Sequence, residues 1–317
     1  MDIVFLLFVL IGAITVAATF VVSRRVLSSK AGFFIITAAA SEQFMGWILL
    51  TAAILAGLVY NSSTYSVLLA AEAAVLFALV LWRRPPAIVE PNNPGLESFT
   101  VMSVNVLYTN EYAHKIVEEV AEVSPDVLVV LEFAGTAQRA MKDLGPLFTS
   151  SFIVDNDNGI TPGVAVFSKR ELVNTNAVFT KGRPIVLVDY PLSDGDTVTI
   201  AGVHTASPVN PVRIETWDAE LETLTNIARS HSEKPFIAAG DFNATVGHAS
   251  FREMLTKGGL IDITSRLKTW TRFPWLPNFL HLDHIVVNSE IAAVTRPIVG
   301  KGYGSDHSPV VGTFTLR

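Results

Sequence analysis

An apolar first quarter is the feature that most constrains how this chain can fold. Residues 3–22 form an uninterrupted apolar run, and about twenty such residues cross a bilayer as a helix. Over the whole chain, 50% of the residues are hydrophobic and the mean hydropathy is +0.42, which is too apolar for one ordinary soluble domain of this length. The excess is concentrated in roughly the first 84 residues. The sequence therefore predicts a membrane region followed by a globular domain.

Within residues 1–84 we expect a transmembrane region of about three helices, at residues 3–22, 45–60 and 65–82. A cleaved signal peptide is the alternative for the first run, but its basic residues follow the apolar stretch instead of preceding it. Residues 85–98 contain several prolines and cannot continue a helix, so they indicate a short, stiff linker. We expect a globular domain to occupy the remaining residues, 99–317.

Charge and cysteine content exclude some functions. The net charge of -6 gives no general attraction to polyanions, so a nucleic-acid partner is not expected. The chain has no cysteine, which excludes both disulfides and thiolate metal sites.

Beyond the linker, β-branched runs alternate with helical patterns. Helical apolar spacing marks residues 114–123 and 212–229. The strand candidates are residues 99–104, 126–131, 163–167, 185–190, 197–203, 236–239 and 284–287. This alternation favours packed sheets flanked by helices.

Polar side chains stand at the ends of these strands, where loops present groups from a rigid scaffold. Taken singly, each of these short motifs is most often just a turn or a satisfied interior histidine. Together they make a candidate site, formed by Asn105, Glu132, His204, Asp241, Asn243, Asp283, Asp306 and His307.

Each residue type has a role in phosphate chemistry. Glu132 offers the hard oxygen that magnesium prefers. Asp241 can orient the attacking water while the amide of Asn243 holds a phosphate oxygen. His307 can stabilise the developing oxyanion, with Asp283 fixing its tautomer. His204 can serve as general acid toward the leaving oxygen.

The order of these residues resembles the endonuclease/exonuclease/phosphatase superfamily along almost all of residues 99–317. The matching pieces are Ser103-Val104-Asn105, Val130-Leu131-Glu132, Val203-His204-Thr205, Gly240-Asp241-Phe242-Asn243, Leu282-Asp283-His284-Ile285 and Ser305-Asp306-His307-Ser308-Pro309. The resemblance implies a four-layer α/β sandwich and hydrolysis of phosphate esters that depends on Mg²⁺ or Mn²⁺. It also implies a metal held by Asn105, Glu132 and Asp306.

A narrower resemblance concerns the substrate. In having a histidine at position 204, the chain resembles the deoxyribonuclease I, sphingomyelinase and inositol-phosphatase branches of the superfamily. In those branches the histidine assists the leaving group. The three spans, the linker and the motif sequences together resemble a membrane-anchored bacterial group associated with teicoplanin resistance. That group is thought to act on lipid-linked phosphates of the cell envelope.

We therefore expect a membrane-anchored phosphohydrolase or phosphodiesterase that cleaves a lipid-linked envelope substrate, such as a polyprenyl pyrophosphate or a phospholipid. A membrane-tethered nuclease and a non-catalytic binding protein with the same fold are the alternatives, and no protein partner is predicted.

Two further features concern contacts with the substrate. Three arginines are candidates for binding a second phosphate, namely Arg183, Arg213 and Arg272. The aromatic stretch 270–280 either rests on the membrane or packs as core.

Two indications disagree about the side of the membrane on which the domain of residues 99–317 lies. Arg24, Arg25 and Lys30 lie between the first two expected spans, and Arg83 and Arg84 follow the third. An odd number of spans places both sets on one side, which the positive-inside rule makes cytoplasmic. The resemblance to the membrane-anchored group instead places the catalytic domain outside the cell, and we expect this second arrangement.

Overall fold

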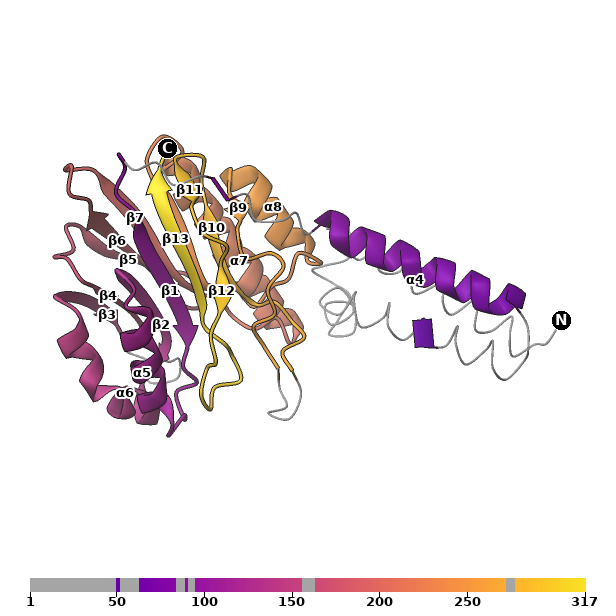
Figure 1. The fold of residues 1–317 in the computed structure, drawn as a ribbon, viewed down its shortest axis with the longest axis horizontal. Helices are drawn as coiled ribbons and strands as arrows, with labels where there is room; N and C mark the ends of the chain where they lie inside the picture. The colour runs from indigo at the N-terminus through magenta and orange to yellow at the C-terminus, as the bar shows by residue number, and fades with distance from the viewer. Residues whose placement is uncertain (1–49, 52–62, 84–88, 91–94, 156–162, 272–276) are drawn as a thin grey trace. The chain divides into compact units, whose positions relative to one another are not determined.

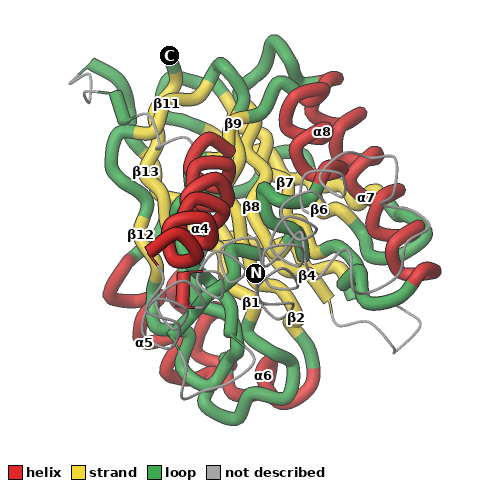
Figure 2. Tube along the Cα trace, turned by 90° about the vertical axis from the view of Figure 1, so that its right-hand side faces the viewer, coloured by secondary structure: helices red, strands yellow, loops and turns green. Residues whose placement is uncertain are grey.

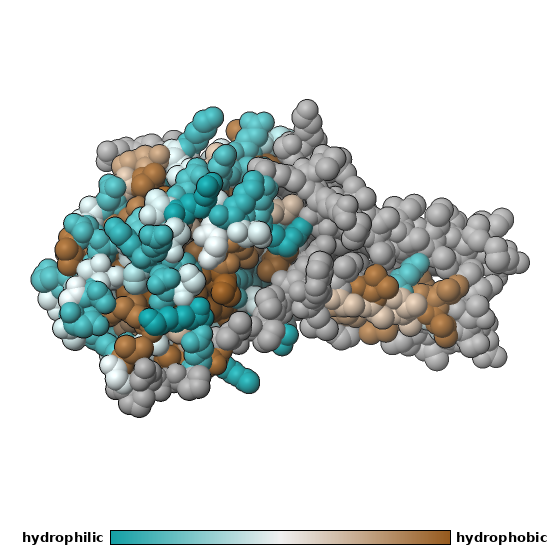
Figure 3. All heavy atoms as spheres, turned by 90° about the horizontal axis from the view of Figure 1, so that it is seen from above, coloured by the Kyte–Doolittle hydropathy of each residue, from teal (hydrophilic) through white to brown (hydrophobic). Residues whose placement is uncertain are grey.

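The computed structural model describes residues 50–51, 63–83, 89–90, 95–155, 163–271 and 277–317. The chain divides into two compact units, and the larger one comprises Pro86–Ser207, Glu215–Ala244 and Glu253–Arg317. In the smaller unit the main described element is helix α4 (Ser63–Arg83), whose described side chains are mostly apolar (Figure 3).

Helix α4 covers the third expected span, residues 65–82. The first expected span lies outside the described residues, as does the second apart from Leu50 and Thr51. Among the helices of the described ranges, none has both the length and the apolar character that a membrane crossing needs. The three spans therefore stay a prediction.

The larger unit contains two mixed sheets (Figure 1). The first has seven strands in the order β11-β13-β1-β2-β4-β3, with β12 also paired to β13. Only β1 and β2 run parallel; the other neighbours in this sheet are antiparallel. Its strands are β1 (Phe99–Asn105), β2 (Val127–Phe133), β3 (Ser150–Val154), β4 (Gly163–Ser168), β11 (Ile291–Ala293), β12 (Ile298–Val299) and β13 (Val310–Leu316).

The second sheet has six strands in the order β5-β6-β7-β8-β10-β9. Here β7 and β8 are the parallel pair, and the other neighbours are antiparallel. Its strands are β5 (Thr175–Val178), β6 (Ile185–Pro191), β7 (Thr197–His204), β8 (Phe236–Asp241), β9 (Ile261–Asp262) and β10 (Asp283–Val287).

Alternation along each strand builds the layers, because successive side chains of a strand point to opposite faces of its sheet. On β2, Val127, Val129 and Leu131 join the buried core that also contains Ile237 and Ile285 of the second sheet. This core therefore lies between the two sheets. The intervening Leu128 and Val130 of β2 belong to a second cluster, outside the first sheet.

Helices cover the outer faces of the sheets (Figure 2). The second cluster includes residues of α5 (Ala113–Val123), α6 (Gly135–Ala140) and the 3-10 helix η1 (Lys142–Leu147), which therefore cover the first sheet. Helix α7 (Pro211–Ser230) lies along the second sheet. Its Trp217 is buried and donates a hydrogen bond to the carbonyl of Phe242. The chain also forms α8 (Ala249–Gly258).

All seven expected strands and both expected helices are present, with ends that differ by at most two residues. The sandwich of two mixed sheets with flanking helices is thereby confirmed. The short edge strands were not predicted from the sequence, and neither was β13, which pairs with β1 inside the first sheet. The described part of the expected linker is paired with the domain, since Val89 forms a bridge with Ala293 of β11.

Candidate active site

The candidate site lies at one edge of the sandwich, where the parallel strands of both sheets end (Figure 1). Asn105 ends β1 and the neighbouring β2 runs parallel to it. His204 and Asp241 end the parallel strands β7 and β8, and they face each other in the register. Asp283 begins the antiparallel β10 directly opposite Asp241. Sheet pairing thus brings together His204, Asp241 and Asp283, and the packing of the two sheets adds Asn105, whose amide reaches Asp241.

Asp241 is the centre of this group and is only 1% exposed. The amide nitrogen of Asn105 lies 3.3 Å from Asp241 Oδ2 and 3.3 Å from Glu132 Oε1, so it donates to both carboxylates. The backbone N–H of Asn243 donates to Asp241 Oδ1 over 2.8 Å. Burial raises the pKa of Asp241, which favours its protonated form relative to an exposed aspartate.

Glu132 reaches the site because β2 is irregular at this point. Strand alternation alone would point Glu132 to the outer face, with Leu128 and Val130. Glu132 instead has φ +58°, and the register with β4 shifts between Leu131 and Phe133. Such bulges re-aim a side chain. Phe133 consequently joins the outer cluster, and the half-buried carboxylate of Glu132 bonds to Asn105.

The turn after β8 depends on a glycine. A Cβ at Gly240 would lie 1.8 Å from the carbonyl oxygen of Val203, so the parallel strand β7 leaves no room for any side chain. Asn243 follows with φ +46°, a left-handed conformation that asparagine tolerates better than most residues. Its amide nitrogen donates to the carbonyl of Thr205 over 3.0 Å. The turn therefore ties Asp241 to the segment after His204.

His307 and Asp283 form a buried pair, with 2.8 Å between His307 Nδ1 and Asp283 Oδ2. His307 Nε2 faces Asp241 Oδ2 at 3.7 Å. Burial opposes a charged imidazole, but the negative charges of Asp283 and Asp241 outweigh it and raise the pKa of His307. At neutral pH the site therefore holds a cationic His307 between two carboxyl groups.

His204 is in a different electrostatic state. Its Nε2 lies 3.8 Å from Asp241 Oδ2 and 3.9 Å from Glu132 Oε1. Complete burial, followed by the positive charges of Arg183 and His307, holds the pKa of His204 well below its usual range. His204 is therefore neutral at pH 7, and it acts as a hydrogen-bonding group more readily than as a source of a proton.

Asp306 is half-buried in the loop before His307. Its Oδ2 accepts a hydrogen bond from the indole N–H of Trp270 over 3.0 Å, and its backbone oxygen accepts one from Thr271. The same loop is tied to β1, because the Ser305 hydroxyl donates to the carbonyl of Asn105 over 2.7 Å. Trp270 thus belongs to the structure of the site, although in the sequence it stands out only as part of an aromatic stretch.

The three arginines differ in their placement. Arg183 donates from a guanidinium nitrogen to the carbonyl of Thr205, the residue after His204. Arg213 is exposed on the first turn of α7, and its backbone N–H bonds to Asn210. Arg272 lies outside the described residues. The structure therefore brings Arg183 to the loop that follows His204.

The residues fit a divalent cation. Carboxylates and an amide supply oxygen atoms, the donors that Mg²⁺ and Mn²⁺ prefer. Ligand atoms of Asp241, Asp283 and His307 also lie within 4.8 Å of one another. Glu132 and Asp306 are both half-buried, so their carboxylates are accessible at the rim of the group. A hard cation at this edge would offset the crowded negative charge.

A second buried group of this type was not anticipated. Asp262, His281 and His284 also have ligand atoms within 4.8 Å of one another. His284 Nδ1 lies 2.8 Å from Asp262 Oδ2, and its Nε2 lies 2.9 Å from the carbonyl of Ala244. Both ring nitrogens of His284 therefore lie at hydrogen-bond distance from oxygen atoms. The contact between His284 and Asp262 joins β10 to β9.

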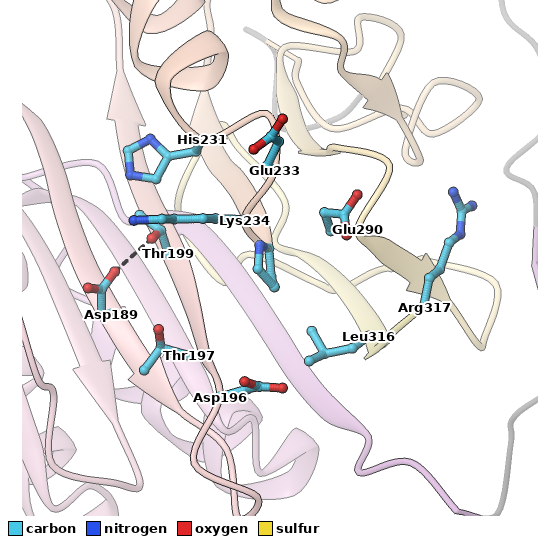
Figure 4. A pocket seen from close by; sticks show the side chains of 11 residues that line it. Asp189, Asp196, Thr197, Thr199, His231, Glu233, Lys234, Glu290, Leu316 and Arg317 are labelled. Atoms are coloured by element: carbon cyan, nitrogen blue, oxygen red, sulfur yellow. Dashed lines mark hydrogen bonds between the residues drawn. The ribbon is translucent and has the colours of Figure 1, made fainter.

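A polar pocket of about 500 Å³ lies elsewhere (Figure 4). Thr197 and Pro235, at the starts of β7 and β8, contribute to its lining. The site residues His204 and Asp241 end those same strands. The pocket is thus at the opposite end of the second sheet. Its Asp189 is held by the hydroxyl of Thr199 over 2.7 Å.

Solved structures with this fold are known. An endonuclease/exonuclease/phosphatase from Beutenbergia cavernae matches with 18% identity and a TM-score of 0.55, covering 69% of this chain and 72% of that one. TDP2 from Caenorhabditis elegans matches with 13% identity and a TM-score of 0.58, over 82% and 83% of the chains. The human Nocturnin catalytic domain matches with 18% identity and a TM-score of 0.52, over 72% and 100%. No curated protein sequence matches the chain.

A family model adds sequence evidence to this likeness of fold. The model of the Endonuclease/Exonuclease/phosphatase family matches residues 102–307, which is more than half of the chain. The matched range begins in β1 and ends at His307, so it contains every residue of the candidate site. The chain belongs to the endonuclease/exonuclease/phosphatase family.

Proposed function

We propose that this protein is a metal-dependent phosphohydrolase that cleaves a phosphate ester or pyrophosphate bond of a lipid-linked cell-envelope substrate. The observation that carries the proposal is the environment of Asp241. One carboxylate is approached by the side-chain amide of Asn105, by the backbone N–H of Asn243 and by the charged His307. These are the groups that water attack on phosphorus needs, namely a proton acceptor and donors for the developing negative charge.

Bound Mg²⁺ or Mn²⁺ would be held by Glu132, Asp306 and Asn105, and it would neutralise charge on the phosphate. Asp241, whose pKa burial raises, orients the attacking water and accepts its proton. Asn243 and the cationic His307 bind the phosphoryl oxygens, and Asp283 keeps the His307 ring in place through its Nδ1. The neutral His204 donates a hydrogen bond toward the leaving oxygen.

An amphiphilic substrate is supported by aromatic side chains at the catalytic edge. Phe179 and Phe279 are 69% and 39% exposed. Phe179 lies on the loop that carries Arg183, and Phe279 lies near Asn278, whose amide donates to Ser308 beside His307. Exposed aromatic rings of this kind suit an acyl or isoprenoid chain, or the surface of a membrane. The apolar first quarter would keep the domain close to such substrates.

We further propose that the protein is a multi-pass membrane protein whose catalytic domain faces outward. Fusions placed after Arg317 test this arrangement. An alkaline phosphatase fusion should be active and a green fluorescent protein fusion dark. The reverse pattern would place the domain on the cytoplasmic side, in accordance with the positive-inside rule.

The function is tested with the full chain purified in detergent. Phosphate or head-group release is measured with Mg²⁺ or Mn²⁺ against polyprenyl pyrophosphate, phospholipid and oligonucleotide. Asp241→Asn should lose release by about a thousandfold, the scale of a positioned acid–base group. Asp189→Asn is the matched control, because Asp189 is also a hydrogen-bonded aspartate of the second sheet but lines the distant pocket.

The outcomes separate the alternatives. Release from the lipid phosphates that a chelator abolishes supports the proposal. Cleavage of the oligonucleotide alone would instead identify a membrane-tethered nuclease. Full activity of Asp241→Asn would overturn the mechanism, and no release from any substrate together with no metal binding would indicate a non-catalytic binding protein.

A further inference from the structure

A buried glutamate on α7 lies behind the active site, where neither the sequence motifs nor the mechanism uses it. Glu220 is 1% exposed, although a buried carboxylate is costly unless hydrogen bonds satisfy it. Its Oε1 accepts the backbone N–H of Arg183 over 2.6 Å, and its Oε2 accepts that of Ala206 over 2.6 Å. One side chain therefore joins two loops that both lead to the catalytic edge.

The first of these loops connects β5 to β6 and carries Arg183. Its conformation is closely fitted to α7, since a Cβ at Gly182 would lie 2.2 Å from Glu220 Oε1 and 2.6 Å from Thr216 Cγ2. The Thr180 hydroxyl donates to the carbonyl of Arg183 over 2.9 Å and so closes the loop. Helix α7 thus determines where the Arg183 backbone lies.

The second loop follows His204. The carbonyl of Thr205 accepts hydrogen bonds from the Arg183 guanidinium over 2.6 Å and from the Asn243 amide over 3.0 Å. The backbone N–H of Thr205 donates to the carbonyl of Asp241 over 3.0 Å. Arg183 is therefore connected through one residue to both Asp241 and Asn243, and Glu220 holds the two sides of this connection together.

We propose that Glu220 is a positioning residue that keeps the Arg183 guanidinium at the catalytic edge, where Arg183 binds a second phosphate group and favours diphosphate substrates. The inference rests on the proposed function, because it names the substrate class of the same site. An arginine is suited to this task since its planar group binds phosphate oxygens in pairs. A cation held on the carbonyl of Thr205, the residue after His204, serves a substrate that carries more negative charge than a monoester.

Binding measurements test the inference separately from turnover. Calorimetry on the full chain in detergent, with Mg²⁺, compares methylenediphosphonate, which cannot be hydrolysed, with inorganic phosphate. We expect the wild type to bind the diphosphonate more tightly. Arg183→Ala should weaken diphosphonate binding about tenfold, the effect of losing one charge-assisted hydrogen bond, and should change phosphate binding little.

Glu220→Gln keeps the shape of the side chain but places an amide where the carboxylate meets two N–H donors. It should also weaken diphosphonate binding about tenfold. In the double variant with Arg183→Ala, Glu220→Gln should add almost no further loss, because the two residues act through one contact. Additive losses, or an unchanged preference in Glu220→Gln, would overturn the proposal.

Two further variants guard against a purely structural effect. Gly182→Ala retains the carboxylate but pushes the loop from α7, so it should reproduce the loss of preference even if Glu220→Gln folds poorly. Glu119→Gln is the matched control, because Glu119 is also a buried helical glutamate that accepts a backbone N–H, from Lys301 over 2.8 Å. Its preference for diphosphonate should equal that of the wild type.

The result also distinguishes this inference from the proposed function. If the wild type hydrolyses none of the substrates but shows the non-additive diphosphonate binding, the function is wrong and the role of Glu220 holds. If the wild type hydrolyses lipid phosphates but binds diphosphonate no better than phosphate, the function holds and the role of Glu220 is wrong.

Discussion

Two aspartate–histidine pairs in this domain have the same hydrogen-bond distance but different surroundings. In each pair, 2.8 Å separate the histidine Nδ1 from a carboxylate oxygen, in Asp283–His307 and in Asp262–His284. The other nitrogen of His307 faces Asp241 at 3.7 Å, which is too far for a strong hydrogen bond. The other nitrogen of His284 bonds to the Ala244 carbonyl at 2.9 Å.

In the proposed mechanism Asp283–His307 is the reactive pair, and Asp262–His284 is the structural pair. His307 keeps one nitrogen directed at Asp241, the carboxylate that we propose activates water, so it is placed to contact a substrate. His284 has both nitrogens satisfied and is completely buried, so it can only hold β9, β10 and the Ala244 turn together. The hydrogen-bond distance within the pair is therefore the same in both cases, and the partner of the second ring nitrogen is what distinguishes them.

The largest expected effect is on catalysis in the first pair. His307→Gln removes the charged donor beside Asp241 and should lower kcat about a thousandfold, while the metal still binds. Phosphate release under saturating substrate measures this loss. A variant that kept a tenth of the wild-type rate would show that His307 does not touch the reacting phosphate.

The next effect is on stability in the second pair. Asp262→Asn leaves a buried histidine without its counter-charge and should lower the free energy of unfolding by about 3 kcal/mol. Urea unfolding followed by circular dichroism measures the change. The activity of the folded fraction should stay near that of the wild type, and a selective loss of activity at full stability would erase the contrast between the pairs.

A smaller catalytic effect is expected from the partner of His307. Asp283→Asn preserves the shape of the side chain but removes the charge that favours the imidazolium. We expect kcat to fall about a hundredfold, within the range of lost acid–base assistance. The pH–rate profile provides the check: the group that must be protonated for activity should titrate at lower pH in the variant, because Asp283 raises the pKa of His307.

The smallest effect concerns pH. Burial works against a charged Asp262, but His284 outweighs it and lowers the pKa of Asp262 from 3.8 to about 2. A carboxyl group with a lowered pKa stabilises the fold above its unfolded pKa, and the stabilisation, about 2 kcal/mol, is lost as the pH falls through the folded value. The stability difference between wild type and Asp262→Asn should therefore shrink between about pH 4 and pH 2. A constant difference over this range would refute the ion pair.

Much of the fold was predictable because strong local patterns produced it. The seven expected strands are runs of β-branched residues, and helix α7 has Trp217, Leu221 and Leu224 on one buried stripe. Strand β13 was missed although Val310, Val311 and Phe314 are strand-forming and buried. Its place beside β1 depends on pairing over more than two hundred residues, which no local window contains.

The candidate site was predictable in its residues but not in its geometry. Strand ends indicated Asn105, His204 and Asp241, because parallel strands present their carboxyl ends at one edge. The bulge at Glu132 was not foreseen, and without it strand alternation would direct that carboxylate away from the site. Trp270 and Glu220 were also not assigned roles, since each acts through a partner at least fourteen residues away along the chain.

By itself the sequence determined the order of the polar motifs and, from them, the family to which the chain belongs. The adjacent residues Asp283 and His284 show what it could not determine. They lie in one motif, yet Asp283 joins the reactive pair and His284 the structural pair. The reason is physical: successive residues of a strand face opposite sides, and only the packed sandwich decides which side meets His307 and which meets Asp262.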